Sequence, residues 1–585
     1  MNKTGYIAGI ARGHNGGVCL LKDGEVVFSI EEERLSRKKY DGGPYASIVK
    51  ILDYTDKLDY LVISHTQEDT SHTDFSGDTV YKALIRKLRL INEKDIDKKV
   101  IEVHENHHEQ HAAVAFYRSG FEKAVSLIVD GAGTFLSMGQ ETVWETESIF
   151  ECAYPAEFKK IYTHIGGRGP FGSARFTDNK GCETVINESA GIVKAYEAVT
   201  QYCGWQPIEA GKTMGLFPYG KENLKIPKIY HNEDGLAAWT STNRNLIIPT
   251  YPNGALVNAN KYKELEGPFE EVEDVTLLQN RRDMAYAVQT QSQQQVLDLI
   301  RKAVKMSGNK NVVISGGYGL NCVANYWYLG QLKDEGINLY VEPISNDAGT
   351  AIGAAMAQYH KVTNDTTVRK RSDTLYFGFE YNYSDEDIAN AVAKVQNAKI
   401  INTNATYADA VKIMRDKNIV AMFQGKSENG PRALGNRSLM FDPTFKDGKD
   451  YVNLIKNREY FRPFAASVLK EDTKDWFDLR GMESSPHMMY AVNCQPGVEE
   501  KIPSVIHIDG TCRIQTVTKD QNEHYHNLIT EFKNQTGVPL VFNTSFNLGG
   551  DPLVETIDDA LYTLEKSKLE YLYLPEYKII IKVSN

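Results

Sequence analysis

The sequence predicts a mixed α/β and α+β protein with two domains. Short runs rich in β-branched and aromatic residues alternate with stretches whose apolar residues recur at helical spacing. Several of these runs end in glycine-rich turns, which is typical of strands that lead into helices. The chain has 585 residues, which is more than one domain usually holds.

The N-terminal part begins with closely spaced strand patterns. We expect strands at residues 6–10, 17–21, 25–30, 60–64, 99–103 and 124–129. Helical patterns at 46–54 and 106–118 lie between them. The strand and glycine turn that open the chain have an echo near residues 129–133, which indicates a duplicated half-domain.

The central part continues this alternation and then ends in a polar stretch. Helices are expected at 283–306, from about residue 320, and at 347–357, with strands at 311–315 and 338–342. The polar stretch predicts a linker at 361–374, between a first domain at 1–360 and a second at 375–585. An ordinary long surface loop is the alternative interpretation of that stretch.

Composition excludes several classes of protein. The 66 Lys and Arg against 77 Asp and Glu give a net charge of −11, which argues against a broad nucleic-acid or anionic membrane surface. No apolar run is long enough to cross a bilayer, and no secretory signal is recognised, so we expect a cytoplasmic protein. The seven scattered cysteines contain no CxxC pair, which disfavours a disulfide framework. A small basic pocket stays compatible with this acidic chain.

Four histidines lie within eight residues of one another, at His104, His107, His108 and His111. His107 and His111 are four apart on a predicted helix, so both imidazoles project from one face and can bind one metal ion. Imidazole suits iron or zinc, and a carboxylate from elsewhere in the chain would complete the site. The alternative is a packed or solvated face of histidines.

Four glycine-rich turns, at residues 10–17, 130–133, 315–319 and 346–349, follow predicted strands or begin predicted helices. Glycine lets backbone N–H groups approach phosphate oxygens, and a helix N-terminus favours anions. Together the turns indicate a nucleotide site, although each alone is compatible with a plain β-turn. Their spacing fits neither a P-loop nor a dinucleotide fingerprint.

The second domain has a local excess of cations and hydrogen-bond donors among Gly, Pro and Phe residues. If they converge they form a phosphate or carboxylate site, since arginine binds such groups in bidentate fashion. Exposure on the surface is the alternative for each of them. The residues in this pattern are Arg432, Arg437, Lys456, Arg458, Arg462, Arg513, Asn543, Thr544, Ser545 and Asn547.

Long ordered segments of the chain resemble the O-carbamoyltransferases of the nodulation-protein-U and cephem-carbamoyltransferase family. They include NHHEQHAAVAFYRSGF, SGGYGLNCVAN, SNDAGTAIGAA, GPRALGNRSL and KNREYFRPFAASVL, and they cover nearly the whole chain. The resemblance implies an actin/Hsp70-like first domain, similar to the threonylcarbamoyl transferases. It also implies a second domain that forms carbamoyl adenylate, similar to the threonylcarbamoyl-adenylate synthases.

The resemblance further implies a reaction and its co-substrates. Carbamoyl phosphate would be split to carbamate in the second domain, and carbamate would react with ATP to give carbamoyl adenylate. The first domain would then transfer the carbamoyl group to a hydroxyl and release AMP. Fe(II) or another divalent metal is the implied cofactor, and Mg²⁺ with the ATP is compatible with this chemistry.

The resemblance assigns roles to individual residues. His107, His111 and Asp347 would bind the metal, and His14 would deprotonate the acceptor hydroxyl. Asp130 would contact the acceptor or the nucleotide. The residues expected to line the nucleotide are Gly316, Gly317 and Asn321. The residues expected to hold carbamoyl phosphate and the ATP phosphates are Arg432, Lys456, Arg458, Arg462, Arg513, Asn543 and Ser545.

The chain departs from the family pattern at two positions. Relatives often carry a carboxylate directly after the turn at Asp130, where this chain has Thr134, and they tend to carry Phe where it has Asn429. The acceptor is expected to be a small molecule with a hydroxyl group: an antibiotic sugar, an oligosaccharide or a hydroxymethylated nucleotide. The acceptor would contact loops within 69–95 and 221–274. A homo-oligomer is compatible with the sequence.

Two other functions compete with carbamoyl transfer to a small molecule. The first domain alone would suit a factor that transfers threonylcarbamoyl to tRNA, but the acidic charge and the second domain speak against this. A non-catalytic ATP-binding module of the actin/Hsp70 type needs neither the histidine pair nor the cations.

Overall fold

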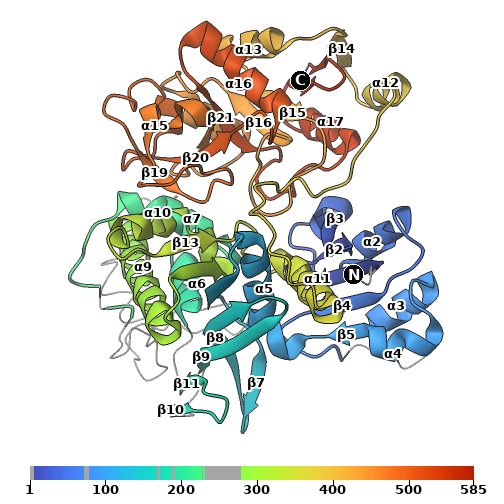
Figure 1. Cartoon of the computed structure of the whole chain (residues 1–585). Helices are drawn as coiled ribbons and strands as arrows, with labels where there is room; N and C mark the ends of the chain where they lie inside the picture. The colour runs from blue at the N-terminus through green and yellow to red at the C-terminus, as the bar shows by residue number, and fades with distance from the viewer. Residues whose placement is uncertain are drawn as a thin grey trace. The chain divides into compact units, whose positions relative to one another are not determined.

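The computed structural model describes residues 5–70, 78–167, 172–187, 191–226, 228–230 and 278–584. The chain forms two compact units (Figure 1). Unit 1 consists of Met1–Val27, Gly42–Ala324 and Gln331–Ser372. Unit 2 consists of Phe28–Asp41, Asn325–Gly330 and Asp373–Asn585.

The first sheet of unit 1 has the strand order β3-β2-β1-β4-β5. Strand β1 is antiparallel to β2 and parallel to β4, and β4 is parallel to β5. The strands are β1 (Tyr6–Ala11), β2 (Gly17–Lys22), β3 (Glu25–Glu31), β4 (Tyr60–Ser64) and β5 (Val100–Glu102). All five lie within a residue or two of the strands predicted from the sequence.

The second sheet repeats this order as β9-β8-β6-β12-β13, with β11 and β10 beyond β9 and β7 paired to β8. Its β6–β8 pair is antiparallel, and β6, β12 and β13 are parallel. The repeated order matches the duplication indicated by the sequence, and it is the arrangement of an actin/Hsp70-like fold. The strands are β6 (Lys123–Val129), β7 (Phe135–Met138), β8 (Glu141–Ala153), β9 (Glu157–Gly167), β10 (Ala174–Thr177), β11 (Glu183–Ile186), β12 (Asn311–Ser315) and β13 (Asn338–Val341).

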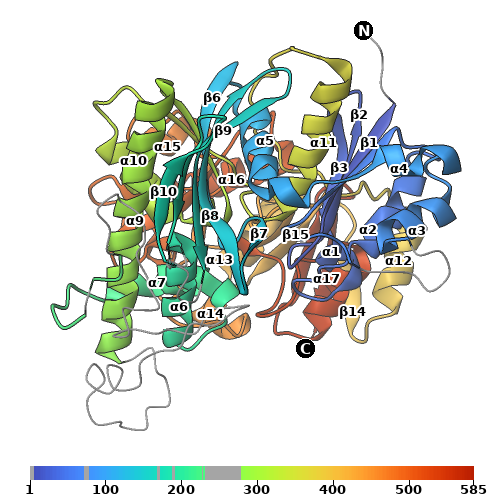
Figure 2. The same cartoon turned by 90° about the horizontal axis from the view of Figure 1, so that it is seen from below.

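Two helices lie between the sheets of unit 1 (Figure 2). Helix α5 (His107–Ser119) packs against β6 and β12, and helix α11 (Ala348–Thr363) packs against β1, β2, β4 and α5. The approach is close enough to require glycine. A Cβ on Gly9 would lie 1.9 Å from the carbonyl oxygen of Ala351, and a Cβ on Gly353 would lie 2.0 Å from that of Gln110.

The helices predicted in the first part agree with the structure except at their ends. The pattern at 46–54 becomes a short helix α2 (Tyr45–Val49) followed by a 3-10 turn, and α11 continues to Thr363, so the expected linker begins inside a helix. The predicted helices at 283–306 and from about residue 320 are α9 (Gln279–Ser307) and α10 (Cys322–Gln331). Further helices had no counterpart in the prediction: α3 (Val80–Leu88), α4 (Ile96–Lys99), α6 (Ile192–Tyr202) and α7 (Ala210–Leu216).

Unit 2 is built on one mixed sheet with the order β14-β23-β22-β15-β16-β21-β17-β20-β19-β18. Its central strands are β15 (Val420–Phe423), β16 (Arg437–Phe441), β17 (Ala465–Leu469), β20 (Thr511–Val517) and β21 (Leu540–Ser545). Its outer strands are β14 (Ala398–Asn402), β18 (Phe477–Asp478), β19 (Ala491–Cys494), β22 (Tyr571–Leu574) and β23 (Ile579–Val583).

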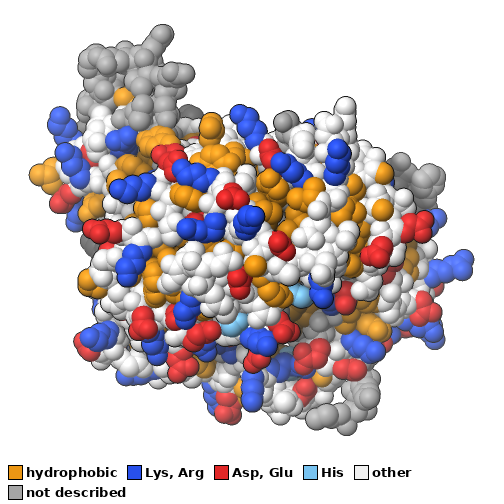
Figure 3. All heavy atoms as spheres, turned by 90° about the horizontal axis from the view of Figure 1, so that it is seen from above, with side chains coloured by type: hydrophobic (Ala, Val, Ile, Leu, Met, Phe, Trp, Pro, Cys, Tyr) orange, Lys and Arg blue, Asp and Glu red, His pale blue; other side chains and the backbone are white. Residues whose placement is uncertain are grey.

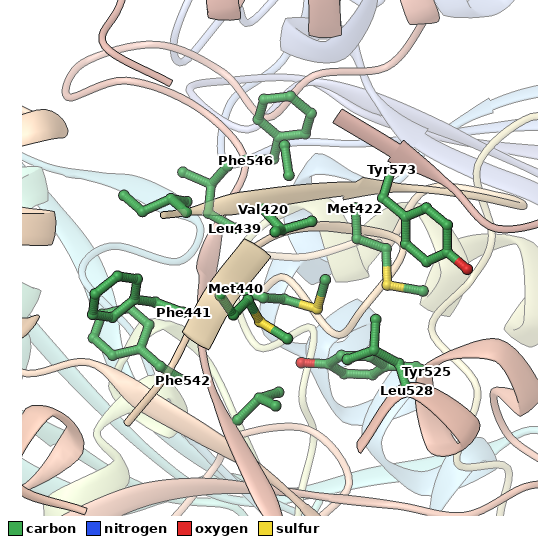
Figure 4. Close-up of a cluster of buried hydrophobic side chains, with 14 of the residues drawn as sticks. Val420, Met422, Leu439, Met440, Phe441, Tyr525, Leu528, Phe542, Phe546 and Tyr573 are labelled. Atoms are coloured by element: carbon green, nitrogen blue, oxygen red, sulfur yellow. The ribbon is translucent and has the colours of Figure 1, made fainter. Parts of the chain in front are cut away.

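The core of unit 2 forms between this sheet and its helices. Figure 4 shows Met422 of β15, Phe542 of β21 and Leu528 of α16, all fully buried, within one apolar cluster. The helices are α12 (Asp385–Ala393), α13 (Tyr407–Arg415), α14 (Gly448–Ile455), α15 (Thr473–Trp476), α16 (Glu523–Thr536) and α17 (Ile557–Glu565).

Unit 2 also contains helix α1 (Glu32–Ser36), from near the N-terminus. Arg34 donates to the carbonyl of Gly430 at 3.0 Å. Arg37 donates to the carbonyls of Leu553 at 2.6 Å and Pro552 at 3.2 Å. The early segment therefore stabilises two loops that are encoded some 400 or more residues later.

Among the described residues, no helix combines the length and the apolar character that a membrane crossing requires. On the face drawn in Figure 3, Lys and Arg side chains are interspersed with Asp and Glu side chains.

Candidate metal centre and anion site

Four side chains of unit 1 come together to form a group able to bind a metal ion: His107, His111, Asp130 and Asp347. The histidines lie on the first turns of α5, Asp130 follows β6, and Asp347 immediately precedes α11. One ligand atom from each residue lies within 4.8 Å of those of the others. The structure thus joins the predicted histidine pair to both predicted aspartates.

The donor atoms of this group face one another. Nε2 of His107 is 3.8 Å from Asp130 Oδ2 and 3.7 Å from Asp347 Oδ1, and Nε2 of His111 is 3.5 Å from Asp347 Oδ1. Both Nε2 atoms are buried and have no hydrogen-bond partner among the described residues. Buried nitrogens of this kind need a partner, and two imidazoles with two carboxylates fit a divalent cation such as iron or zinc.

Ser315 at the end of β12 supports the orientation of His111. Its Oγ lies 3.2 Å from His111 Nδ1, on the side of the ring opposite the metal-facing nitrogen. Such a contact fixes the ring so that Nε2 stays directed at the site. Sequence reasoning placed Ser315 in a glycine turn and did not find this role.

The electrostatics of the group favour a bound positive charge. Burial disfavours a charged His107, but Asp130 and Asp347 outweigh it and raise its pKa to about 10. Burial opposes ionisation of Asp347, but His14, His107 and His111 hold its pKa well below the usual range. The pKa of Asp130 is also lowered, with burial again outweighed, chiefly by its contact with His107. Two ionised carboxylates therefore face the imidazoles.

His14 lies on the other side of Asp347. Its Nδ1 is 3.6 Å from Asp347 Oδ2, while Oδ1 of the same carboxylate faces the two ligand histidines. The His14 side chain is 50% exposed, so a substrate hydroxyl has access to it. The expected base thus stands next to the expected metal ligands.

The expected nucleotide residues divide into two groups. The backbone N–H of Gly317 donates to Asp130 Oδ1 at 2.9 Å, and Gly316, with φ of 90°, packs against the backbone of Val129. Asn321 instead exchanges hydrogen bonds with Gln289 and accepts one from the N–H of Ala324 at 3.0 Å. The turn therefore borders the metal group, whereas the Asn321 amide stabilises the start of α10.

Thr134 does not add a ligand to this centre. Its Oγ1 donates to the carbonyl of His104 at 2.8 Å, and its carbonyl accepts from the N–H of Glu145. Asp130 provides the second carboxylate of the group in this chain.

Sequence reasoning missed a pair of charges on α6. Lys194 Nζ is 2.8 Å from Glu197 Oε2, and Glu197 Oε1 lies 3.0 Å from the position of a Cβ on Gly131. Burial raises the pKa of Glu197, with Asp130 adding to the effect and Lys194 opposing it. Lys194 and Glu197 match no sequence motif, so the sequence gives no reason to assign them a role. Their nearness to the Asp130 turn becomes visible only in the folded chain.

Two more histidines near the centre were also not assigned a role. His108 Nδ1 is 2.8 Å from Ser148 Oγ, and a Cβ on Gly133 would lie 2.5 Å from its Nε2, so His108 packs beneath the turn at Asp130. His65 follows β4, and burial together with Arg12 lowers its pKa to about 4. Its position directly after the predicted strand at 60–64 was the available signal.

Unit 2 gathers the predicted cations around Arg458. Burial lowers the pKa of this guanidinium, and the charges of Arg462, Arg513 and Arg432 lower it further, while Glu459 opposes them. Positive charge this concentrated in a partly buried place stabilises a bound anion.

Lys456 belongs to the same cluster. Its Nζ donates to the carbonyl of Ser545, and lies 3.3 Å from Ser545 Oγ and 3.2 Å from Asn547 Oδ1. Burial, then Arg458 and Arg462, hold its pKa well below the usual range. Ser545 and Asn547, which were predicted as donors, thus act as acceptors and position the lysine beside the arginines.

Arg437 and Asn543 direct their hydrogen-bond donors at acceptors of the protein itself. Arg437 is fully buried, donates to the carbonyl of Glu555 at 3.1 Å, and lies 3.8 Å over the Phe423 ring. Asn543 donates to the carbonyl of Ala433 at 3.1 Å and to Ser467 Oγ at 2.9 Å. Asn543 therefore supports the loop that carries Arg432, whereas Arg437 joins the carbonyls of Gln424 and Glu555.

The stretches expected to contact the acceptor fall partly outside the described residues. This applies to 71–77 within 69–95 and to 227 and 231–274 within 221–274.

Comparison with known proteins places this architecture in a family. The carbamoyltransferase N-terminus model matches residues 69–356, and the carbamoyltransferase C-terminus model matches residues 411–581. Together the two matches span most of the chain.

Curated relatives match over nearly the whole length. The uncharacterized protein sll1178 of Synechocystis sp. is 28% identical over 98% of this chain and 96% of its own. Nodulation protein NolNO of Sinorhizobium fredii is 29% identical over 97% of this chain and 79% of its own. Among solved structures, full-length HypF in its phosphate- and nucleotide-bound form has a TM-score of 0.36 and 13% identity, covering 62% of this chain and 57% of that one. From the two family matches, the chain belongs to the carbamoyltransferase family.

Proposed function

We propose that this protein is an O-carbamoyltransferase that uses carbamoyl phosphate and ATP to form carbamoyl adenylate and then carbamoylates a hydroxyl. The observation that carries the proposal is the cluster of Arg432, Lys456, Arg458, Arg462 and Arg513, where burial and the neighbouring positive charges lower the pKa of Lys456 and of Arg458. A family that transfers carbamoyl groups needs such a site for a phosphorylated carbamoyl donor.

The reaction in unit 2 uses this charge twice. Carbamoyl phosphate and water give carbamate and phosphate, and carbamate then attacks the α-phosphorus of ATP to give carbamoyl adenylate and pyrophosphate. The arginines neutralise the phosphate oxygens in both steps, and Lys456 supplies a cation held in place by Ser545 and Asn547. Enclosure of the carbamate keeps it from bulk water.

The transfer step uses the residues of unit 1. The acceptor hydroxyl adds to the carbamoyl carbon while His14 takes its proton, and cleavage of the bond to the phosphate releases AMP. An imidazole that is half exposed and lies next to an ionised Asp347 is suited to this task, since the carboxylate stabilises the imidazolium that forms. Gly316 and Gly317 offer backbone next to Asp130 for the adenylate.

His107, His111, Asp130 and Asp347 would hold the divalent metal, for which Fe(II) is our first choice. When bound, the metal would supply electrostatic stabilisation of charge on the carbamoyl or phosphate oxygens. We propose a small-molecule acceptor, such as an antibiotic sugar, an oligosaccharide or a hydroxymethylated nucleotide.

The test is a reaction with purified protein, carbamoyl phosphate, ATP, Mg²⁺ and Fe(II) against a metabolite extract. We expect AMP release that depends on carbamoyl phosphate, and a product heavier than its acceptor by about 43 Da, the mass of the transferred group less the hydrogen it replaces. Arg458→Gln should abolish both signals. Arg301→Gln is the control, since that exposed guanidinium pairs only with Glu335 on the surface among the contacts described.

Intact carbamoyl phosphate after incubation with ATP, metal and a broad set of hydroxyl compounds would contradict the proposal. AMP release that requires tRNA and threonine would instead favour the threonylcarbamoyl alternative.

A further inference from the structure

Arg12 and His65 occupy equivalent places at the ends of neighbouring strands. Strands β1 and β4 are parallel, Ala11 is in register with Ser64, and the N–H of Arg12 donates to the carbonyl of Ser64 at 3.0 Å. Because parallel strands end at the same edge of a sheet, the side chains that follow them meet there. His14 follows β1 at that same edge.

The contacts of His65 Nδ1 fix the tautomer of its ring. Arg12 Nη2 lies 2.9 Å from Nδ1, and the backbone N–H of Gln67 lies 3.1 Å from it. A guanidinium and a backbone N–H can only donate, so Nδ1 is the acceptor and the ring hydrogen is on Nε2. The carbonyl of Gln67, which accepts from Arg12 Nη2 at 2.8 Å, is also 3.1 Å from Nδ1, so two donors and one acceptor surround this nitrogen, and the two donors favour the tautomer with its hydrogen on Nε2.

Arg12 is itself held in place. Its Nη1 is 2.9 Å from Asp69 Oδ1, in an ion pair whose carboxylate side chain is 3% exposed. The ion pair with this buried carboxylate therefore holds the guanidinium in its place beside His65. This chain of contacts, from Asp69 through Arg12 to His65, makes the orientation of the imidazole rigid.

The opposite nitrogen, Nε2, faces the site of unit 1. A Cβ on Gly13 would lie 3.7 Å from His65 Nε2 and 3.9 Å from Asp347 Oδ2, and Gly13 has φ of 129°, where a side chain is strained. Residue 13 thus lies between His65 Nε2 and Asp347, and because it is glycine no Cβ is in contact with these two groups. A donor at this place is available to a substrate oxygen.

We propose that His65 is a catalytic hydrogen-bond donor, whose Nε2–H binds the carbonyl oxygen of the carbamoyl group during transfer. This inference rests on the proposed function. As the acceptor oxygen bonds to the carbamoyl carbon, its proton passes to His14 and the C=O electron pair moves onto oxygen, where His65 stabilises it. The pair then reforms the C=O bond, the bond to the phosphate oxygen breaks, and AMP leaves.

His65 neither gains nor loses a proton in this step. A fixed donor is effective because it needs no reorganisation when the charge develops, and the loss of one such donor typically lowers kcat by about 10²–10³-fold. Arg12 acts through His65 and is a positioning residue.

The first experiment separates transfer from the earlier steps. We expect His65→Leu to lower kcat for carbamoyl transfer by about 10²–10³-fold without changing the KM for carbamoyl phosphate. His65→Gln should recover part of the loss, since its amide offers a donor. Carbamoyl-phosphate-dependent exchange of pyrophosphate into ATP, and the metal content, should equal those of the wild type. His526→Gln, on unit 2, is the control.

A wild-type kcat in His65→Leu would overturn the inference. So would loss of bound metal together with activity, which would make His65 a support for Asp347 instead of a donor to substrate. If the wild-type protein transfers no carbamoyl group, the proposed function fails, and the following measurement still tests the arrangement by itself.

The second experiment observes the ring directly by ¹⁵N NMR of histidine-labelled full-length protein, with the His65 signals assigned by their absence in His65→Gln. We expect the pattern of a neutral ring protonated on Nε2, and a mixture of tautomers in Arg12→Gln. A ring protonated on Nδ1 in the wild type would overturn the inference.

Discussion

Asp347 divides its two carboxylate oxygens between two neighbours. Oδ1 faces the imidazoles of His107 and His111, and Oδ2 faces His14. A single side chain thus connects the candidate metal centre to the candidate base. This arrangement predicts that a substitution of His14 affects proton transfer and leaves metal binding intact, whereas a substitution of Asp347 affects both.

We expect His14→Gln to retain the metal and lose carbamoyl transfer, because His14 touches only the outer oxygen among the site residues described. Asp347→Asn should lower metal affinity by about 10-fold to 100-fold, and this variant should lose carbamoyl transfer as well. Metal analysis after dialysis, combined with the transfer assay, checks both. A His14→Gln protein without metal would show that the base and the metal centre are not separable.

A second prediction at the residue scale concerns pH. Burial and two arginines lower the pKa of Lys456, so between that lowered value and the ordinary lysine value the folded protein binds fewer protons than the unfolded chain. The free energy of unfolding therefore rises with pH across that window. A bound anion reverses this, because it favours the charged lysine.

Sulfate is a suitable probe, since its own charge is constant above pH 5. We expect its affinity to fall as the pH rises through the lowered pKa of Lys456, with uptake of about one proton per sulfate on the alkaline side. Calorimetry in buffers of different ionisation enthalpy measures the uptake. In Lys456→Met the uptake should vanish, and uptake of the same size there would assign it to another group.

At the scale of elements, α5 and α11 determine the geometry of the metal centre. Helix α5 carries both histidines and α11 is preceded by Asp347, and the two helices touch at Gly353. Their separation therefore sets the distance between the imidazoles and the carboxylate.

We expect Gly353→Ala to destabilise the protein by about 1–3 kcal/mol and to weaken metal binding, because the new methyl group would lie 2.0 Å from the carbonyl of Gln110. Thermal unfolding and metal titration measure the two effects. Gly211→Ala on α7 is the matched control, since nothing lies within 4 Å of its Cβ position, and it should stabilise by about 0.5–1 kcal/mol. Equal metal affinity in the two variants would contradict the prediction.

The sequence pattern was sufficient for the strands and helices that it predicted in the first part of the chain, and for local pairs of residues. Strands such as Tyr60–Ser64 were predicted to the residue because apolar runs and turn residues bound them on both sides. The spacing of His107 and His111 lies within one helix and is a local property. The His65 arrangement was not predicted, because it depends on β1 and β4 being neighbours, and strand order is not encoded locally.

The same distinction explains Arg437. By composition it is indistinguishable from Arg432, since both stand in one glycine-rich segment. Only the fold shows that Arg437 begins β16 and donates to backbone carbonyls inside the core of unit 2.

At the scale of the whole molecule, unit 2 requires a segment from the N-terminal part of the chain. Ser29 and Asn429 are joined by a 2.6 Å hydrogen bond, and Arg37 donates to the loop at Pro552 and Leu553. Unit 2 is therefore incomplete when residues 373–585 are taken alone.

We expect Arg37→Ala to weaken unit 2 by about 1.5–3 kcal/mol, because two carbonyls lose a charged donor. Hydrogen exchange of peptides around residues 551–556 measures this locally. Lys38→Ala is the control, since that exposed side chain should change stability by less than about 0.5 kcal/mol. Unchanged exchange in Arg37→Ala would show that the α1 contacts are dispensable.

The chain passes between the two units five times, near residues 27, 41, 324, 330 and 372. A chimera that joins the halves of two carbamoyltransferases at one crossover point would therefore combine mismatched pieces within each unit. An exchange of unit 2 between relatives must carry three separate stretches of gene together. We therefore expect the two units of such a protein to have evolved together, and not to have been exchanged separately between relatives.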